Sequence, residues 1–573
     1  MKRLLTVFAV IVFTMSFSSQ GNAQAYLDTS SFTISAQIEP SDFAEWPDSI
    51  GAWKVFATYD LDKDGKKEFL VIADPASGTV SSEMPYIFRF EATGNNAYAL
   101  VWSAKLPGTN PGEFSYPDVT VADMDKDGNQ EIFIGIPASG RNGSLDPNPP
   151  RVLVYEYETA LGNFPTTPTM TTNLGLPDGV RYTTSRVIVE NIDSDPEIEM
   201  FVSSRNDDFG TSQGGGRTIM IFHLSADDIS SGSFTAFDRE FVDSAAYLKG
   251  GSIYDIGVVD FDGDGKKELW VATWDMLSLA IYETTGPNTY VLQADVNQVT
   301  KPFDIGFRSS MHFYDGNKDG KLEMYAAGNL GDGNNPGAVF YVGNVTDVAT
   351  IDSAKVKRIS PWVNGADYDA WSIEGGSVGD IDGDGKVDYF AAGAGTIHRN
   401  LYRLEYKSGS YDSESSFSWD SVYYAKNDST YDFRNVAIAN DLDGDNKKEI
   451  LLPNLFTRTG TTDAAIIILE SKVVVTSIQQ VSNLAPATFT LEQNFPNPFN
   501  PSSSIRFSLK IEGYVELFIT NALGQRVGSL VNGKTAAGAH EVTFNADGLS
   551  SGTYFYTLKS GNFVETKKMV LLK

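Results

Sequence analysis

Short runs of apolar and β-branched residues recur between about residue 26 and residue 475, and Gly, Pro, Asn and Asp bound most of them. Runs of this length and composition predict β-strands rather than helices. Pairs of runs flank a series of short acidic segments, as Val55–Tyr59 and Phe69–Ile72 do around the first one. The pattern therefore predicts a series of β-hairpins, each with an acidic loop at its turn.

A third apolar run follows each hairpin, and a fourth often follows it, as at Ala97–Lys105. The third runs are Tyr86–Phe90, Val152–Tyr157, Ile219–His223, Leu279–Tyr282, Val339–Val342, Leu401–Tyr406 and Ala465–Leu469. Four strands in each period of about 60 residues, repeated seven times, are typical of β-propeller blades. The sequence thus predicts an all-β chain with a seven-bladed β-propeller over residues 26–475.

The seven acidic loops carry the same residue types at the same offsets. Their first residues lie between 55 and 69 residues apart, which indicates a repeat of one structural unit. Five loops have an acid at each of positions 1, 3, 5 and 9, and in the other two an Asn replaces one acid. Loop by loop, these positions hold Asp60, Asp62, Asp64, Glu68; Asp123, Asp125, Asp127, Glu131; Asn191, Asp193, Asp195, Glu199; Asp260, Asp262, Asp264, Glu268; Asp315, Asn317, Asp319, Glu323; Asp380, Asp382, Asp384, Asp388; and Asp441, Asp443, Asp445, Glu449.

This spacing favours calcium. Carboxylates at positions 1, 3 and 5 of a tight loop can converge on one ion, and position 7 can add its backbone carbonyl, as in an EF-hand. The closing acid stands at position 9 instead of the EF-hand's position 12, so these loops are shorter. Hard oxygen ligands in this number suit Ca²⁺ better than Mg²⁺, and the sequence predicts up to seven structural calcium ions. The alternative is a set of solvated Asp-Gly turns without metal, in which converging carboxylates would repel one another.

The loops differ at the glycine position, which permits a sharp turn. In the third loop Pro196 occupies this position, and Pro cannot adopt positive φ. The same loop begins with Asn191 in place of Asp. In the seventh loop Asn446 stands at the glycine position, and Asn tolerates the left-handed region. The third site is therefore expected to be weak or empty.

The composition excludes several classes of function. The net charge of the 573-residue chain is −30, with 74 acids against 44 bases, which argues against a nucleic-acid partner. Cysteine is absent, so disulfides, thiolate metal sites and cysteine nucleophiles are excluded. Only four histidines are present, and none forms a closely spaced metal-binding pair, which makes a zinc hydrolase improbable.

Residues 1–25 have the layout of a signal peptide. Lys2 and Arg3 precede an apolar stretch over Leu4–Phe17, and small residues follow, so that cleavage is expected after Ala23 or Ala25. An uncleaved N-terminal anchor is the alternative. No later segment is apolar enough to span a bilayer, so the mature chain is expected to lack a transmembrane segment.

The composition changes again beyond the propeller. Residues 476–490 are expected to be a linker, and residues 491–573 carry short alternating strands that predict a small immunoglobulin-like β-sandwich. This module resembles the type A sorting domain of the type IX secretion system in its segments Leu491–Pro501, Leu523–Val527, Ser551–Tyr556 and Lys567–Lys573. The resemblance implies export through the type IX machinery, then removal of the domain and either release or attachment to the outer cell surface. An ordinary terminal immunoglobulin-like domain is the alternative.

Residues 26–475 resemble the FG-GAP/VCBS repeat family, to which the propeller of the integrin α-subunit belongs, because seven DxDxDGxxE-type loops recur at propeller spacing. The resemblance implies calcium ligation by the four residues of each loop, loops between the first two strands of each blade, and binding on the opposite face. Pro196 departs from the family pattern, which puts the third site in doubt.

Two functions fit these observations. The first is a secreted or cell-surface binding or adhesion module for a glycan or protein ligand, with candidate contact loops at Ala73–Pro85, Pro137–Pro150, Ser203–Gly216 and Gly328–Gly337; plain linkage is the alternative role of these loops. The second is a polysaccharide-acting lyase or glycoside hydrolase, whose sugar-stacking residues would come from the tryptophans, although the organised acids are committed to the loops. The sequence contains no nucleophile elbow, P-loop or dinucleotide fingerprint, and no catalytic residue is assigned. The eight tryptophans are Trp46, Trp53, Trp102, Trp270, Trp274, Trp362, Trp371 and Trp419.

Overall fold

The structure is a computed structural model, and it describes residues 26–572 except for a set of short segments. The expected signal peptide, the central parts of the four candidate contact loops, and Trp274, Trp362 and Trp371 lie outside the described residues. The segments left out are 48–49, 58–59, 76–83, 108–116, 138–147, 181, 194, 208–217, 233, 245–252, 274–278, 297–304, 308–310, 331–336, 362–371, 383, 395–399, 426–430, 446, 456–463, 475–477, 483–488, 501, 511–512, 536–537, 547–548 and 562.

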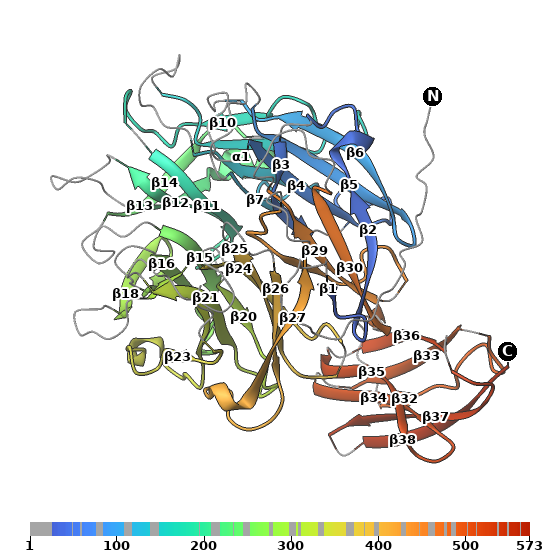
Figure 1. The fold of residues 1–573 in the computed structure, drawn as a ribbon. Coiled ribbons are helices and arrows are strands. Elements are labelled where there is room, and N and C mark those ends of the chain that lie inside the picture. The colour runs from blue at the N-terminus through green and yellow to red at the C-terminus, as the bar shows by residue number, and fades with distance from the viewer. Residues whose placement is uncertain are drawn as a thin grey trace, which may run out of the picture.

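The described residues before position 475 form seven antiparallel sheets arranged as the blades of a propeller (Figure 1). In the first four blades the strands pair in chain order, and the first strands of neighbouring blades lie against one another around the centre of the ring. These blades consist of β3 (Ile50–Ala57), β4 (Glu68–Pro75), β5 (Tyr86–Gly94) and β6 (Ala97–Lys105); β7 (Asp118–Ala122), β8 (Glu131–Gly135), β9 (Val152–Glu156) and β10 (Met170–Thr172); β11 (Tyr182–Glu190), β12 (Glu199–Asp207), β13 (Thr218–Leu224) and β14 (Phe237–Ser244); and β15 (Ile253–Val259), β16 (Glu268–Thr273), β17 (Leu279–Gly286) and β18 (Thr289–Val296). The helix α1 (Ala226–Ser231) links β13 to β14.

Blades five to seven follow the same plan; the N-terminus supplies the fourth strand of blade seven and adds a fifth strand to blade six. The strands are β19 (Ile305–Phe307), β20 (His312–Tyr314), β21 (Glu323–Leu330), β22 (Gly337–Val342) and β23 (Lys357–Arg358); β24 (Ser372–Gly379), β25 (Asp388–Ala394), β26 (Asn400–Tyr406) and β27 (Phe417–Tyr424); and β28 (Ala437–Ala439), β29 (Lys447–Pro453) and β30 (Ile466–Val474). The outer strand of blade seven is β2 (Phe32–Ile38), paired with β30, and β1 (Tyr26–Leu27) pairs with β27 of blade six. The N-terminal strands therefore close the ring.

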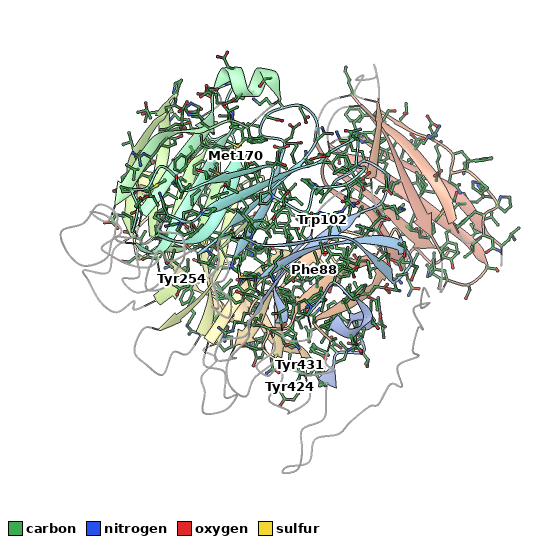
Figure 2. All side chains as sticks on the ribbon, turned by 90° about the horizontal axis from the view of Figure 1, so that it is seen from above. Phe88, Trp102, Met170, Tyr254, Tyr424 and Tyr431 are labelled. Atoms are coloured by element: carbon green, nitrogen blue, oxygen red, sulfur yellow. The ribbon has the colours of Figure 1, made fainter. Side chains whose placement is uncertain are left out.

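Apolar cores lie between neighbouring blades, which explains why the second and third strands read as nearly continuous apolar runs. Side chains alternate between the two faces of a strand, so Phe69 of β4 packs toward blade seven while Leu70 packs toward blade two. Phe88 and Trp102, labelled in Figure 2, likewise belong to the cores on opposite sides of blade one. Because both faces of each sheet are covered, the strands need no polar face.

The C-terminal module consists of two four-stranded antiparallel sheets that share one apolar core. One sheet contains β31 (Ile478–Ser482), β36 (Gly538–Asn545), β33 (Ser502–Leu509) and β32 (Thr490–Leu491), and the other contains β35 (Arg526–Thr535), β34 (Gly513–Asn521), β37 (Gly552–Ser560) and β38 (Phe563–Leu571). The expected fold class, a seven-bladed propeller followed by a small β-sandwich, is confirmed. The linker expected at 476–490 differs, because it contains β31, which pairs with β36 of the sandwich.

Candidate metal centres

Each acidic loop is the turn between the first and second antiparallel strands of its blade. Where the sixth residue is glycine, its backbone is left-handed, with φ of +93° at Gly65 and +91° at Gly265. The fourth residue is left-handed as well, with φ of +61° at Lys126 and +78° at Gly263. This second position was not singled out from the sequence, where some loops have lysine, which seldom adopts positive φ, and others have glycine.

Backbone N–H groups of the loop hold its carboxylates in place. In the fourth loop, Gly265 N donates to Asp260 Oδ2 at 3.1 Å and Lys266 N donates to Asp264 Oδ1 at 2.8 Å. The equivalent bond to the first acid spans 2.8 Å from Gly65 N to Asp60 Oδ2. Because these bonds are local, each loop positions its own acids. In the described residues, the loops that bring one oxygen from each of their four acids within 4.8 Å of the others include those that begin at Asp60, Asp123, Asp260 and Asp441.

The closing acid at position 9 is buried, and in several loops only one of its two oxygens has a hydrogen-bond donor. That oxygen accepts from the backbone N–H of position 2, as Glu268 Oε2 does from Phe261 N at 2.8 Å. Asp388, with a shorter side chain, accepts from Ile381 N at 3.1 Å. The second oxygen of Glu268, Glu449 and Asp388 is buried without a protein hydrogen-bond donor. A buried carboxylate oxygen without a donor is costly, and a cation held between the loop acids would satisfy it. The donor set therefore fits a hard cation.

The electrostatics of the loops point the same way. Burial, followed by the neighbouring carboxylates, raises the pKa of Glu268 to about 8 and that of Glu449 to about 9. Burial also raises the pKa of Asp388 well above its usual value. Desolvation and like charges both disfavour the ionised form, so keeping these acids ionised in the fold costs free energy, which a bound cation would offset.

The fifth loop replaces one carboxylate but keeps the arrangement. Gly316 N donates to Glu323 Oε2 at 2.8 Å, and Asn317, which stands at position 3, donates its side-chain amide to Glu323 Oε1. The second oxygen of this closing acid is thus occupied by an amide hydrogen. This loop offers one charge fewer and one less available oxygen than the fourth loop.

The third loop departs further, and the structure gives a reason. Pro196 has no N–H to donate to the first residue, and Asn191 reverses the polarity of that contact. The side-chain amide of Asn191 donates to Asp195 O at 2.8 Å and to the carbonyl of position 7, Glu197 O, at 2.5 Å. An amide donor therefore occupies the carbonyl that would otherwise face a cation, and the turn is held by direct hydrogen bonds.

A further acid beside most loops was not found from the sequence. The closing acid lies opposite a Glu of the third strand, as Glu68 does opposite Glu91 and Glu268 opposite Glu283. The lysine at position 7 joins this Glu to the acid at position 5: Lys266 Nζ lies 2.7 Å from Glu283 Oε1 and 3.0 Å from Asp264 Oδ2. Spacing could not reveal this residue, because the connection between the second and third strands varies in length.

In the third blade the charges of this contact are exchanged. Glu197 stands at the lysine position, and His223 stands where the third-strand Glu is found elsewhere. His223 Nε2 lies 3.6 Å from Glu197 Oε2, and its Nδ1 lies 2.6 Å from Glu240 Oε1. Glu240 Oε2 also accepts from Tyr290 of the next blade at 2.7 Å. His223 thus lies between two carboxylates, one of which also accepts from the neighbouring blade.

The loops are also linked from blade to blade. The acid at position 3 accepts a backbone N–H from the following blade: Asn288 N reaches Asp193 Oδ2 at 2.6 Å, and Val348 N reaches Asp262 Oδ2 at 2.9 Å. At the closure of the ring, Asn96 N of blade one reaches Asp443 Oδ2 of blade seven, also at 2.6 Å. Lysines add further links between loops, from Lys63 to Gly128 O, Lys126 to Pro196 O, Lys67 to Asp441 O, Lys267 to Asn191 O and Lys448 to Asp380 O.

The inner strands carry a second polar belt, which the sequence did not indicate. Lys54 pairs with Asp118, Arg186 Nη1 lies 3.0 Å from Asp118 Oδ1, and Arg186 Nε lies 2.8 Å from Asp255 Oδ1. Four side chains of alternating charge thereby join blades one to four. Burial raises the pKa of Asp118, but Arg186 and Lys54 outweigh it and hold the pKa below its usual value.

Further hydrogen bonds continue this belt around the ring. Met311 N donates to Asp255 Oδ2 at 2.7 Å, and His312 Nε2 lies 2.7 Å from Gly376 O of blade six. Burial lowers the pKa of His312, which agrees with a neutral ring that donates to this carbonyl. The buried ionisable groups near the centre are thus partnered within the chain.

The tryptophan side chains in the described residues pack against other side chains of the blades. Trp46 stacks on Phe88 with ring centroids 4.3 Å apart, Trp270 is fully buried, and Trp419 stacks on Tyr402 at 5.0 Å. Trp53 and Trp102 pack in the core between blades one and two. Their rings are committed to the cores between blades.

Comparison with known proteins assigns the C-terminal module. Residues 493–572 match the family described as the secretion system C-terminal sorting domain. The chain thus carries a type IX sorting domain, which implies interaction with the secretion machinery and export to or beyond the outer cell surface. In the described residues, no helix has the length and apolar character needed to cross a membrane. A search of curated proteins found no relative.

Several solved structures align with the chain at low identity. A fungal alcohol oxidase of the AA5 family in complex with copper is 10% identical, covers 92% of this chain and 100% of its own, and has a TM-score of 0.38. PorZ, a surface component of the type IX secretion system of Porphyromonas gingivalis, is 11% identical, with 89% and 68% covered and a TM-score of 0.33. The intramolecular trans-sialidase of Ruminococcus gnavus is 10% identical, with 74% and 94% covered and a TM-score of 0.35. Likeness at this level says nothing about activity.

Proposed function

We propose that residues 26–475 form a calcium-stabilised propeller of the FG-GAP/VCBS type, which the type IX route exports as a binding or adhesion module for a glycan or protein ligand. The observation that carries the metal assignment is the buried second oxygen of Glu268, Glu449 and Asp388, which has no donor in the protein. At least four loops also gather four carboxylates within 4.8 Å. A divalent cation compensates buried charge of this kind.

The proposed ligands are the residues at positions 1, 3, 5 and 9 of each loop, with the carbonyl of position 7. A bound calcium ion would supply positive charge and coordinate oxygens that otherwise repel one another. The chain's own contribution is to fix those oxygens: backbone N–H groups hold the acids at positions 1 and 5, and a neighbouring blade holds the acid at position 3. We rank the fourth loop above the fifth, and the fifth above the third.

The proposed role of calcium is structural. The loops lie at the turns between the first and second strands, where their acids contact the following blade. An ion at such a joint would hold two blades as well as one hairpin. We assign ligand binding to the opposite face, where long connections join the strands of a rigid ring of sheets. Recognition loops are commonly carried by a rigid scaffold of this kind.

A polysaccharide-acting enzyme is the second candidate, and the described residues offer it little support. The tryptophans expected to stack on sugars are packed between blades, and the organised acids belong to the loops or to closed ion-pair networks. Binding is therefore the function that these observations favour.

The metal assignment is tested by titrating the purified mature propeller with Ca²⁺ and by metal analysis at millimolar calcium. At least three ions per chain and a higher melting temperature with calcium than with chelator are expected, because an ion bound only by the folded state stabilises it. Fewer than three ions would overturn the multi-site assignment. A glycan-array screen with and without chelator then tests the recognition role, and binding that survives chelation unchanged would separate recognition from calcium.

A further inference from the structure

Exposed apolar side chains concentrate in the sorting domain. Eight large apolar residues are exposed among the described residues, and four of them belong to this small domain: Phe495, Leu523, Val564 and Leu572. Leu523 and Phe495 are the most exposed of the eight, at 84% and 80%, and Phe495 is aromatic; Tyr26, the other aromatic residue among them, is 49% exposed. Scattered apolar residues on a surface are ordinary, so the surroundings of Phe495 decide what it means.

Core packing explains the neighbours of Phe495 but not Phe495 itself. Leu491 and Phe499, in the same short segment, are 4% and 2% exposed and belong to the core of the sandwich. Phe495 lies between them in sequence and contributes nothing to that core. The segment thus divides into residues that hold the sandwich together and one aromatic residue that does not.

The backbone around Phe495 is nevertheless firmly held. Phe495 and Ser504 exchange two backbone hydrogen bonds, each 2.9 Å long. The preceding Asn494 is buried, and its N–H donates to Tyr556 Oη at 2.8 Å. The Asn494 side-chain amide donates to Ser503 Oγ at 2.8 Å and to Pro496 O at 3.1 Å. A fixed backbone that presents an aromatic ring to solvent loses little entropy on binding a partner.

The segment also lies against the C-terminal strand β38. Phe499 N donates to Val570 O and Leu572 N donates to Phe499 O, both at 3.0 Å, and Val570 N donates to Asn497 Oδ1 at 2.9 Å. Leu572, which is 54% exposed, therefore lies beside the segment of Phe495. Two stretches that the sequence singled out separately, around residues 495 and 570, form one surface.

We propose that Phe495, flanked by the exposed Pro496 and Pro498 and joined by Leu572, is the anchor through which the secretion machinery binds the sorting domain. The partner is a component of that machinery with an apolar pocket for the ring, because the matched domain serves export. The exposed Lys568 on the adjoining strand favours acidic groups at the rim of the pocket. Buried aromatic anchors commonly dominate such interfaces.

The test uses the full chain, produced in a bacterium that has a type IX secretion system. Phe495→Ser is expected to lower the exported and processed protein at least tenfold and to leave the chain in the periplasm, whereas Phe495→Trp should retain most of the export. Leu161→Ser removes an apolar residue that is 60% exposed on the propeller and is the matched control, with export unchanged. Leu572→Ser should show a smaller loss than Phe495→Ser.

The folded state of the sandwich is checked by thermal melting of the full-length retained chains. Phe495→Ser should melt as the unmodified chain does, because its side chain is exposed. Export of Phe495→Ser at the unmodified level would overturn the proposal. Retention accompanied by loss of the melting transition of the sandwich would also overturn it, because it would assign Phe495 a role in folding.

Discussion

Replacement of Glu268 by Gln should have opposite effects on stability with and without calcium. Glu268 closes the fourth loop, is fully buried, and accepts from Phe261 N through one oxygen while the other has no donor. Gln has nearly the same shape and can accept from Phe261 N through its amide oxygen. The substitution therefore removes an ionisable group, whose ionisation burial and the neighbouring acids oppose, and one cation ligand, and it is expected to keep the hairpin geometry.

The magnitude follows from the spacing of the acids. The ligand oxygens of the fourth loop lie within 4.8 Å of one another, and two full charges at that distance repel by about 3 kcal/mol at an effective dielectric constant of about 20. Partial protonation of the cluster reduces this repulsion, so Glu268→Gln should stabilise the calcium-free protein by about 1–3 kcal/mol. With calcium at 100 times the dissociation constant, the unmodified loop gains about 2.7 kcal/mol from the ion, most of which the variant should lose.

Thermal unfolding at pH 7, in chelator and in excess Ca²⁺, measures both effects. Glu199→Gln is the matched control, because it changes the closing acid of the third loop, where the amide of Asn191 already occupies the position 7 carbonyl. Glu199→Gln should leave the calcium-induced rise in melting temperature unchanged, whereas Glu268→Gln should reduce it. If Glu268→Gln destabilises the calcium-free protein as much as the calcium-loaded one, the uncompensated charge is not the property that matters in this loop.

Three further predictions concern the inner belt and the chain ends. Asp118→Asn leaves Lys54 buried without its carboxylate and Arg186 with Asp255 alone, and it should cost about 3–5 kcal/mol in unfolding free energy. Asp178→Asn, at an exposed position, should change the denaturation midpoint little, and equal effects of the two variants would show that the belt does not stabilise the fold. His312 has a pKa lowered by burial from its ordinary 6.5, so unfolding takes up a proton below pH 6.5 and the melting temperature should fall on acidification there. His312→Gln keeps a donor for Gly376 O and should flatten that decline, and an unchanged pH profile would argue against it. Mass spectrometry of exported protein should find a first residue near Gln24 or Tyr26 and a last residue before Leu491, and an intact C-terminus would contradict removal of the sorting domain.

The sequence by itself determined the features that are local. Each hairpin is specified by a short stretch of sequence, which holds acids at fixed offsets, a residue that permits the sharp turn, and flanking apolar runs. The repetition of these stretches along the chain predicted seven blades. The same locality explains the anomaly at the third loop, since Pro196 lacks the N–H that the residue at this position donates to the first acid of the first, fourth, fifth and sixth loops. The strands β4 and β5 could also be predicted from the sequence, because both faces of each strand are covered in the fold and most of their residues are therefore apolar.

Contacts between distant segments were decided by the tertiary structure alone. Glu283 faces Glu268 because two strands pair at a register that no fixed spacing encodes. The Lys54–Asp118–Arg186–Asp255 belt forms because inner strands from four blades converge, although each residue is an isolated charge in the sequence. Phe495 looks like its apolar neighbours in the sequence, and only the packing of Leu491 and Phe499 into the core leaves it exposed. Local spacing encodes hydrogen bonds within a turn, whereas burial and charge pairing between segments depend on how the whole chain closes on itself.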